Sequence, residues 1–302
     1  MADAPKLLDR VRAEVRMRHY SRRTEEAYVH WIRRYIVFHD KRHPRELGAN
    51  DVTAFLTWLA VERHVSASTQ NQAFSAVLFL YERVLRLDLG VVEHAAHAKR
   101  PLRVPVVLSV DEVRRVLGEL DGIVWLVASL LYGAGLRLQE CLELRVKDLD
   151  FDRREIVVRR GKGQKDRRVM LPEAVRDRLR AHLDVVRDRH ARDLAAGLGR
   201  VVLPAALDRK FPNAPTEWRW QFAFPAGRIC RDERYGPPSR FHLHESVVQR
   251  AVAGAARRAG LTKRVSCHTF RHYAAFRTMP SESDRIQRLR GSGRNAGCLY
   301  SA

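Results

Sequence analysis

The sequence has 302 residues, of which 45% are hydrophobic and only 17 are Gly and 12 Pro, so it predicts a globular chain of about two domains. Lys and Arg number 56 against 35 Asp and Glu, which gives a formal net charge of +21. This excess indicates a polyanionic partner, nucleic acid before an anionic membrane surface, although an Arg-rich surface without a partner is the alternative.

Several protein classes are excluded by what the chain lacks. The N-terminal residues contain no apolar signal segment, and the longest apolar run, residues 123–136, is too short to cross a bilayer. Four scattered cysteines, without a C-x-x-C pair, argue against a disulfide framework or a zinc site. We therefore expect a cytoplasmic protein that has no membrane partner and needs neither a cofactor nor a metal.

Residues 1–90 predict four short helices. The first spans residues 7–15, and the other three follow Ser21, Asn50 and Ser68 as N-caps, each with apolar residues at helical spacing. Arginines lie between the apolar positions. A small bundle with solvated charges and a DNA-binding helical domain both fit this pattern.

Residues 91–108 form a basic, proline-stiffened linker, after which the capping box Ser109–Glu112 opens a second domain. This domain mixes helices and strands. We expect helices at 125–132, 137–144, 172–196 and 245–259, with another beginning at 268–272; a hairpin of strands 155–159 and 167–171; and a strand at 217–224 with an aromatic face.

Three clusters carry chemistry. Arg137 and Glu140 are three residues apart, as are His268 and Arg271, and Lys162 lies at the tip of the hairpin. Taken singly, each signal is weak. Arg137 with Glu140 suits a surface ion pair, the Gly-Lys-Gly segment suits a plain turn, and His268 with Arg271 and Cys267 lacks a third ligand at zinc spacing. Together they suit phosphodiester transfer, because arginines bind the phosphate oxygens and a lysine can protonate the leaving hydroxyl. Since no carboxylate cluster suggests a metal, such a site needs a side-chain nucleophile.

The motifs Gly135-Leu-Arg-Leu-Gln-Glu140, Gly161-Lys-Gly-Gln-Lys-Asp-Arg167 and His268-Thr-Phe-Arg-His272, in this order, resemble the tyrosine recombinases. Within that family, the integron integrase branch is the closer resemblance. Residues of about 200–225, including Glu217-Trp-Arg-Trp-Gln221, are similar to the insertion of that branch.

The resemblance implies a mainly α fold with a small β-sheet: a four-helix SAM-like core-binding domain at 1–90 and an α+β catalytic domain at 109–275, which close on DNA. It implies recombination between a duplex integron site and gene-cassette sites that are bound as folded single strands. It also implies a homo-oligomer assembled on DNA.

Site roles also follow from the resemblance. Arg137 and Arg271 become a phosphate clamp, with Glu140 supporting Arg137. Lys162 becomes the general acid, and His268 a proton-transfer or phosphate-contacting residue. His272 matches the motif but is expected to be structural.

Two features beside these motifs remain open. Trp218 and Trp220 either stack extrahelical bases or fill the core beneath the insertion, and we expect the core for most of this aromatic set. His242 and His244 are expected to be surface loop residues.

Residues 276–302 depart from the family pattern. They contain neither the Leu-Gly-His segment nor the Tyr-Thr-His segment that carries the nucleophile, which suggests a frameshifted or truncated end. Tyr300 lies near the family spacing after Arg271, but its flanking residues do not match, so no nucleophile is assigned. The expected function is thus either an integron-type recombinase with impaired cleavage and weak oligomerisation, or a DNA-binding remnant that occupies sites without cutting; a basic transcriptional regulator is a more distant alternative.

Overall fold

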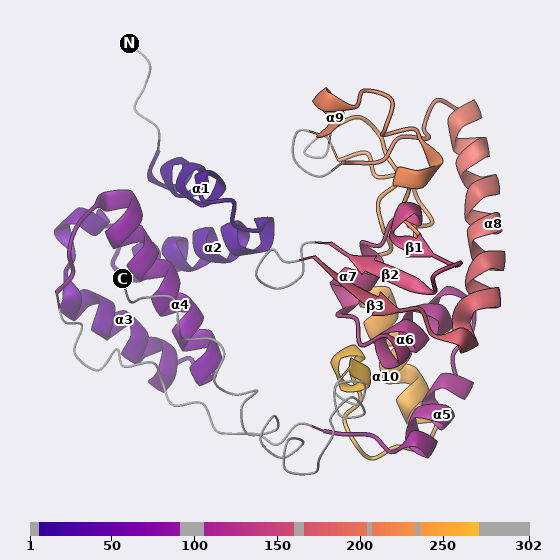
Figure 1. Ribbon diagram of the computed structural model, residues 1–302. Coiled ribbons are helices and arrows are strands. Elements are labelled where there is room, and N and C mark those ends of the chain that lie inside the picture. Colours follow the sequence, from indigo (N-terminus) through magenta and orange to yellow (C-terminus); the bar gives the residue numbers. More distant parts are fainter. Residues whose placement is uncertain (1–5, 91–105, 160–165, 204–206, 233–235, 272–302) are drawn as a thin grey trace. The chain divides into compact units, whose positions relative to one another are not determined.

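The computed structural model of the chain describes residues 6–90, 106–159, 166–203, 207–232 and 236–271 (Figure 1). The chain divides into two compact units, Met1–Leu102 and Arg103–Ala302. Each unit has a hydrophobic core of its own.

The first unit is helical throughout its described part. Its elements are α1 (Leu7–Met17), α2 (Arg22–Phe38), the 3-10 turn η1 (Pro44–Glu46), α3 (Ala49–Val61), α4 (Ala67–Phe79) and the π-helical turn η2 (Leu80–Leu85). The expected four helices are confirmed. In their core the buried hydroxyls of Tyr35 and Tyr81 share a hydrogen bond of 2.9 Å, and the Tyr81 hydroxyl reaches the carbonyl of Pro44 at 2.9 Å. This contact joins α2 to η2 and to the chain before α3.

One of the three predicted N-caps in this unit is confirmed and two are wrong. The Ser21 hydroxyl accepts the Thr24 N–H at 3.2 Å, as expected. Helix α3 begins before Asn50, and its first turn is closed instead by the Asp51 carboxylate, which accepts the Gly48 N–H at 2.8 Å. Ser68 lies inside α4, whose cap is Ser66. In α4 a serine two residues earlier satisfies the free N–H group, and in α3 Asp51 makes the closing contact from inside the first turn.

The second unit combines helices with a small sheet. Its elements are α5 (Val110–Gly118), α6 (Gly122–Gly133), α7 (Leu138–Leu142), η3 (Val146–Asp148), β1 (Leu149–Asp150), β2 (Glu155–Val158), β3 (Arg167–Met170), α8 (Glu173–Ala195), α9 (Leu207–Lys210), η4 (Trp218–Trp220) and α10 (Glu245–Arg258), followed by helical residues 267–271. The capping box of Ser109 and Glu112 opens α5 as predicted. The predicted mainly helical fold with a small sheet is confirmed.

The sheet is antiparallel with the order β1-β2-β3. Leu149 pairs with Ile156, and Val158 pairs with Arg167, so the predicted hairpin is confirmed while β1 was not expected. Along β3 the side chains alternate between half-buried and exposed, with Arg167 and Val169 on the inner face. This alternation decides which of the two adjacent arginines of β3 can reach the interior.

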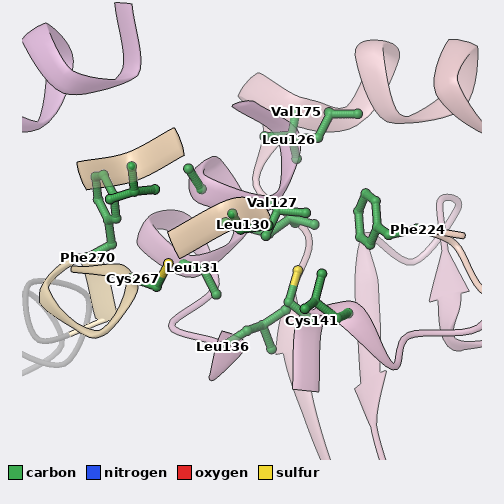
Figure 2. Packing of buried hydrophobic residues seen from close by; sticks show 14 of the residues in the cluster. Leu126, Val127, Leu130, Leu131, Leu136, Cys141, Val175, Phe224, Cys267 and Phe270 are labelled. Atoms are coloured by element: carbon green, nitrogen blue, oxygen red, sulfur yellow. The ribbon is translucent and has the colours of Figure 1, made fainter. Parts of the chain in front are cut away.

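Helix α6 is the centre of the second core. Figure 2 shows its residues Val127 and Leu130 with Cys267 and Phe270 on one side of the view and Phe224 on the other. Apolar residues fill nearly the whole circumference of α6 because other elements cover it on several sides. With 12 residues α6 is too short to span a bilayer, and no other helix in the described ranges has the length and apolarity for a span.

The strand predicted at 217–224 is wrong. Residues 218–220 form the turn η4, and Phe222 and Pro225 make only isolated bridges, to Arg145 and His242. The backbone of this segment bonds to two different parts of the chain, since the Ala223 N–H donates to the Leu144 carbonyl and the Phe224 carbonyl accepts the Leu243 N–H. These single rungs satisfy the backbone groups without forming a continuous ladder.

This segment packs against a small hydrophobic core of its own. That core bears on whether the aromatic residues fill a core or stack on bases. Phe222 and Phe224 are buried, while Trp218 and Trp220 are half-buried. Val201, Leu203, Ala214 and Phe222 form this core, and Trp220 and Phe241 pack against it. Most of the aromatic set therefore fills a core, as expected, and Trp220 lies at its edge.

Candidate active site

The loop between α6 and α7 presents Arg137. Gly135 has a φ of +64°, a left-handed conformation that a side chain would strain, and it turns the chain so that Arg137 becomes the N-cap of α7. The Glu140 carboxylate accepts the backbone N–H of Arg137 at 2.8 Å, which closes the first turn. The chain direction at Arg137 is thus set by backbone contacts.

Glu140 gathers three arginines. It accepts a hydrogen bond of 2.6 Å from the Arg137 guanidinium, and the two N–H groups of Arg167 reach its two oxygens at 3.0 and 2.6 Å. Arg271 donates to the Gly135 carbonyl at 2.7 Å and lies 3.5 Å from Glu140. The structure therefore brings together Arg137, Glu140 and Arg271, as the sequence analysis expected, and adds Arg167.

The carboxylate is buried and the arginines are only partly so. The Glu140 side chain is 9% exposed, against 24% to 37% for its three partners. Burial alone would raise the pKa of Glu140, but hydrogen bonds from Arg167 and from Arg137 outweigh it and lower the pKa to about 2. A carboxylate that is ionised at neutral pH holds three partly exposed guanidiniums, an arrangement that suits an anion with several oxygens. The plain surface-pair interpretation of Arg137 and Glu140 is therefore wrong.

Arg167 was missed as a member of this cluster. In the sequence it stands out only as the last residue of the motif Gly161-Lys-Gly-Gln-Lys-Asp-Arg167. The available signal was the alternation of side chains along a strand: Arg167 and Arg168 are adjacent on β3, so they lie on opposite faces. Arg168 pairs with the half-buried Glu155, while Arg167 points toward Glu140.

His268 lies on the helical residues 267–271, three positions before Arg271, and its side chain is exposed. It lines a shallow hollow of about 220 Å³ together with Arg264, Ser266 and Thr269. The Thr269 hydroxyl accepts the Ser266 N–H at 3.1 Å, which fixes the start of this helical turn. Lys162, His272 and Tyr300 lie outside the described residues, although the two strands that flank Lys162 are described.

A groove of about 770 Å³ extends from the arginine cluster toward the 200–225 segment. Arg137 and Glu140 line it at one side, and Trp220, Phe241 and His242 line it at the other. His242 is half-buried, with its ring against Phe222, whereas His244 caps α10. The expectation of a surface loop residue thus holds for His244 and is wrong for His242.

Between these two sides lies Lys147. Its ammonium is 3.0 Å from the centre of the Trp220 ring. Burial, helped by the positive charge of Arg159, lowers the pKa of Lys147 to about 8, against the opposing effect of Asp148. Nothing in the sequence pattern indicated this contact, because Lys147 and Trp220 are far apart in the chain.

Metal binding needs three or more closely placed ligands. The described residues contain no group of three His, Cys, Asp or Glu side chains placed for this. What the described site offers is a cluster of three guanidiniums around Glu140. The charged residues that line the groove beside it are of both signs: Arg137, Arg145, Lys147 and Arg159 with Glu140, Glu143, Asp148 and Asp166.

Two family models match the chain. Residues 7–91 match the phage integrase N-terminal SAM-like domain, and residues 107–291 match the phage integrase family. An "Integrase/recombinase" of Escherichia coli is 47% identical over 279 residues, which cover 92% of this chain and 83% of the relative. The tyrosine recombinase XerD of Agrobacterium fabrum is 29% identical over 268 residues, covering 82% and 73% of the two chains.

Solved structures give the same fold. A lambda integrase dimer bound to a COC′ core site aligns with a TM-score of 0.59 at 14% identity and covers 98% of both chains. XerH recombinase bound to difH in a pre-cleavage complex aligns with a TM-score of 0.57 at 16% identity, covering 97% of this chain and 80% of XerH. Together with the matched family models, these similarities show that the chain belongs to the phage integrase family, the tyrosine recombinases.

Proposed function

We propose that this chain is a site-specific DNA recombinase of the integron integrase type whose own strand cleavage is impaired. The observation that carries the DNA-directed part is the cluster in which Glu140 holds Arg137, Arg167 and Arg271 at the edge of a large groove. Their outer guanidinium groups suit the non-bridging oxygens of a phosphodiester, on which negative charge grows in the transition state. The net charge of +21 adds a general attraction to DNA.

In this proposal Arg137 and Arg271 hold the scissile phosphate, while Glu140 and Arg167 hold the clamp in shape. The family reaction has a tyrosine hydroxyl attack the phosphorus, so that a 3′-phosphotyrosyl bond forms as the bond to the 5′ oxygen breaks. Lys162 would give its proton to that leaving oxygen, and His268 would assist proton transfer or contact the phosphate.

The integron-type part rests on the 200–225 segment. Its motif is similar to the insertion of that branch, and its half-buried Trp220 lines the same groove as Arg137. An aromatic face at this place is suited to stacking on an unpaired base. We therefore propose that cassette sites bind as folded single strands and the integron site as duplex.

The impaired cleavage rests on residues 273–302, where the Leu-Gly-His and Tyr-Thr-His segments do not occur and where Tyr273 and Tyr300 are the two tyrosines present. This same observation favours a second candidate function, a protein that occupies recombination sites without cutting them. Both versions predict weakened assembly of protomers on DNA. Light scattering on two bound sites measures this, and a stable four-protomer complex would contradict it.

Covalent trapping tests the proposal. Purified protein is mixed with a folded bottom-strand cassette hairpin and, separately, with a nicked duplex site, and adducts that resist SDS are counted. We expect no adduct but a salt-sensitive gel shift on both. An adduct that is lost in Tyr300→Phe would identify Tyr300 as a nucleophile and overturn the impaired-cleavage part. A missing gel shift would overturn the DNA-directed part itself.

A further inference from the structure

Lys147 is held at a fixed place in the groove by the turn η3. The Asp148 carboxylate accepts the Arg145 backbone N–H at 3.0 Å and the Arg159 guanidinium at 2.7 Å, so the backbone on both sides of Lys147 is anchored. From this turn the Lys147 side chain reaches the ring of Trp220, 3.0 Å from the ring centre. The ammonium therefore lies in the same groove as Arg137.

The carboxylates around this ammonium serve other cations. Glu140 is bound by Arg137 and Arg167, Asp148 is bound by Arg159, and Asp166 lies 3.8 Å from Arg159. Glu143, the remaining acid of the groove, is exposed. Among the described residues, the face of Trp220 is the single partner that the Lys147 ammonium contacts. The other charged groups near Lys147 are Arg145 and Arg219, and both lower its pKa.

An ammonium carries three N–H donors, and an aromatic face satisfies them poorly. A phosphate oxygen offers a charge-assisted hydrogen bond, which is shorter and stronger. An anion beside Lys147 would also offset the repulsion that Arg159, Arg145 and Arg219 exert on its ammonium. Contact with Trp220 is thus the weaker of the two arrangements once a phosphate is within reach.

Resting on the proposed function, we propose that Lys147 is a phosphate-binding residue of the groove, which leaves the ring of Trp220 for a backbone phosphate of the bound DNA. The flexible four-carbon stem allows this movement without a change in η3. The groove then binds the DNA backbone at two separate places, one at the Glu140 cluster and one at Lys147.

The slope of log affinity against log salt tests the proposal on a labelled mixed-sequence duplex and on a folded single-stranded hairpin. Lys147→Met is expected to reduce the size of the slope by about 0.9 on the duplex and about 0.7 on the hairpin, the change for one lost phosphate contact. Lys147→Arg should keep the wild-type slope. Lys263→Met is the matched control, since the Lys263 ammonium is held by Glu112 and is not part of the groove lining.

A pH series separates this role from a structural one. The free protein holds Lys147 with a pKa of about 8, whereas a phosphate partner favours the charged form, so DNA binding takes up a proton as the pH rises past that value. The affinity of the wild type should therefore fall across this range, and Lys147→Arg should remove that fall. The two proteins share every other titratable group, so the difference between their profiles belongs to Lys147.

The outcomes are distinct. An unchanged salt slope in Lys147→Met, or equal pH profiles for wild type and Lys147→Arg, would overturn the role of Lys147 while the wild type still bound DNA. A slope near zero in the wild type would instead overturn the proposed function. If Lys147→Met does not fold, the pH profile of Lys147→Arg alone decides the matter.

Discussion

Two arginine sites of the second unit use the same side chain in opposite ways. In the Glu140 cluster, three partly exposed arginines share one buried carboxylate. Arg145 is itself buried, donates to the carbonyls of Trp220 at 2.6 Å and Val202 at 2.8 Å, and lies 4.5 Å from the centre of the Phe222 ring.

This difference separates arginines that are placed to bind an anion from an arginine that stabilises the fold. Arg145 donates hydrogen bonds to backbone carbonyls of the 200–225 segment and so connects this segment to η3. The arginines around Glu140 are each partly exposed, so an anion can approach them. An arginine whose contacts are mainly to buried carbonyls is therefore expected to govern stability, and one that shares a carboxylate at a groove is expected to govern binding.

Glu140→Gln should have the largest effect. It leaves three guanidiniums close together with a single neutral acceptor, and we expect a loss of about 3 kcal/mol in the free energy of unfolding, at the low end for a broken buried pair because the arginines are partly solvated. Urea denaturation measures it. A loss below about 1 kcal/mol would mean that solvent already screens the cluster.

Arg145→Met is expected to cost about 2 kcal/mol, since two carbonyls of half-buried residues lose a charged donor while the side chain volume is roughly kept. DNA affinity should keep its salt slope, because Arg145 has little left to offer a phosphate. A slope that drops by about 0.9 would break the distinction between the two arginine sites.

The dependence of the free energy of unfolding on pH in the acid range tests the role of Glu140. Its pKa is about 2 in the folded chain against an ordinary 4.5, so its stabilisation is fully present above the ordinary value and is lost as the pH falls toward about 2. We expect about 1–2 kcal/mol to disappear over this range after allowance for screening. The measurement compares wild type with Glu140→Gln at each pH, so that other carboxylates cancel, and a constant difference would contradict it.

The smallest expected effect compares two neighbours on β3. Arg167→Met should lower the free energy of unfolding by about 1 kcal/mol through lost contacts to Glu140, and Arg168→Met by less than about 0.5 kcal/mol, because its pair with Glu155 is largely exposed. Thermal denaturation of both variants checks this. Equal losses would show that the face of β3 on which an arginine lies does not determine its contribution to the free energy of unfolding.

Much of the fold could be read from local patterns. The helices that became α2, α6, α8 and α10, the capping box of α5 and the hairpin of β2 and β3 all follow from spacing and turn chemistry. The errors occur where several residues compete for one local role. Ser66 and Ser68 both suit a cap, and residues 217–224 carry strand-like aromatic alternation although their backbone makes only isolated bridges to two other segments.

The site residues also divide into those that local patterns predict and those that require the tertiary structure. Arg137, Glu140 and Arg271 belong to recognisable motifs, so they could be singled out, and the pairing of Arg137 with Glu140 follows from their spacing of three. The contact of Arg271 with Glu140 is tertiary. Arg167 required knowledge of which face of β3 points inward. Arg145 and Lys147 required the position of Trp220, which only the packing of the 200–225 segment supplies.

By itself, the sequence determined the family, the charge, the helix pattern and the motifs in which Arg137, Glu140 and Arg271 lie, because short-range spacing and motif order are written along the chain. Only the tertiary structure decided that one carboxylate holds three arginines, that Arg145 is used internally, and that Lys147 lies against Trp220. Those contacts join residues far apart in the chain, and their energies depend on burial, which no local pattern specifies.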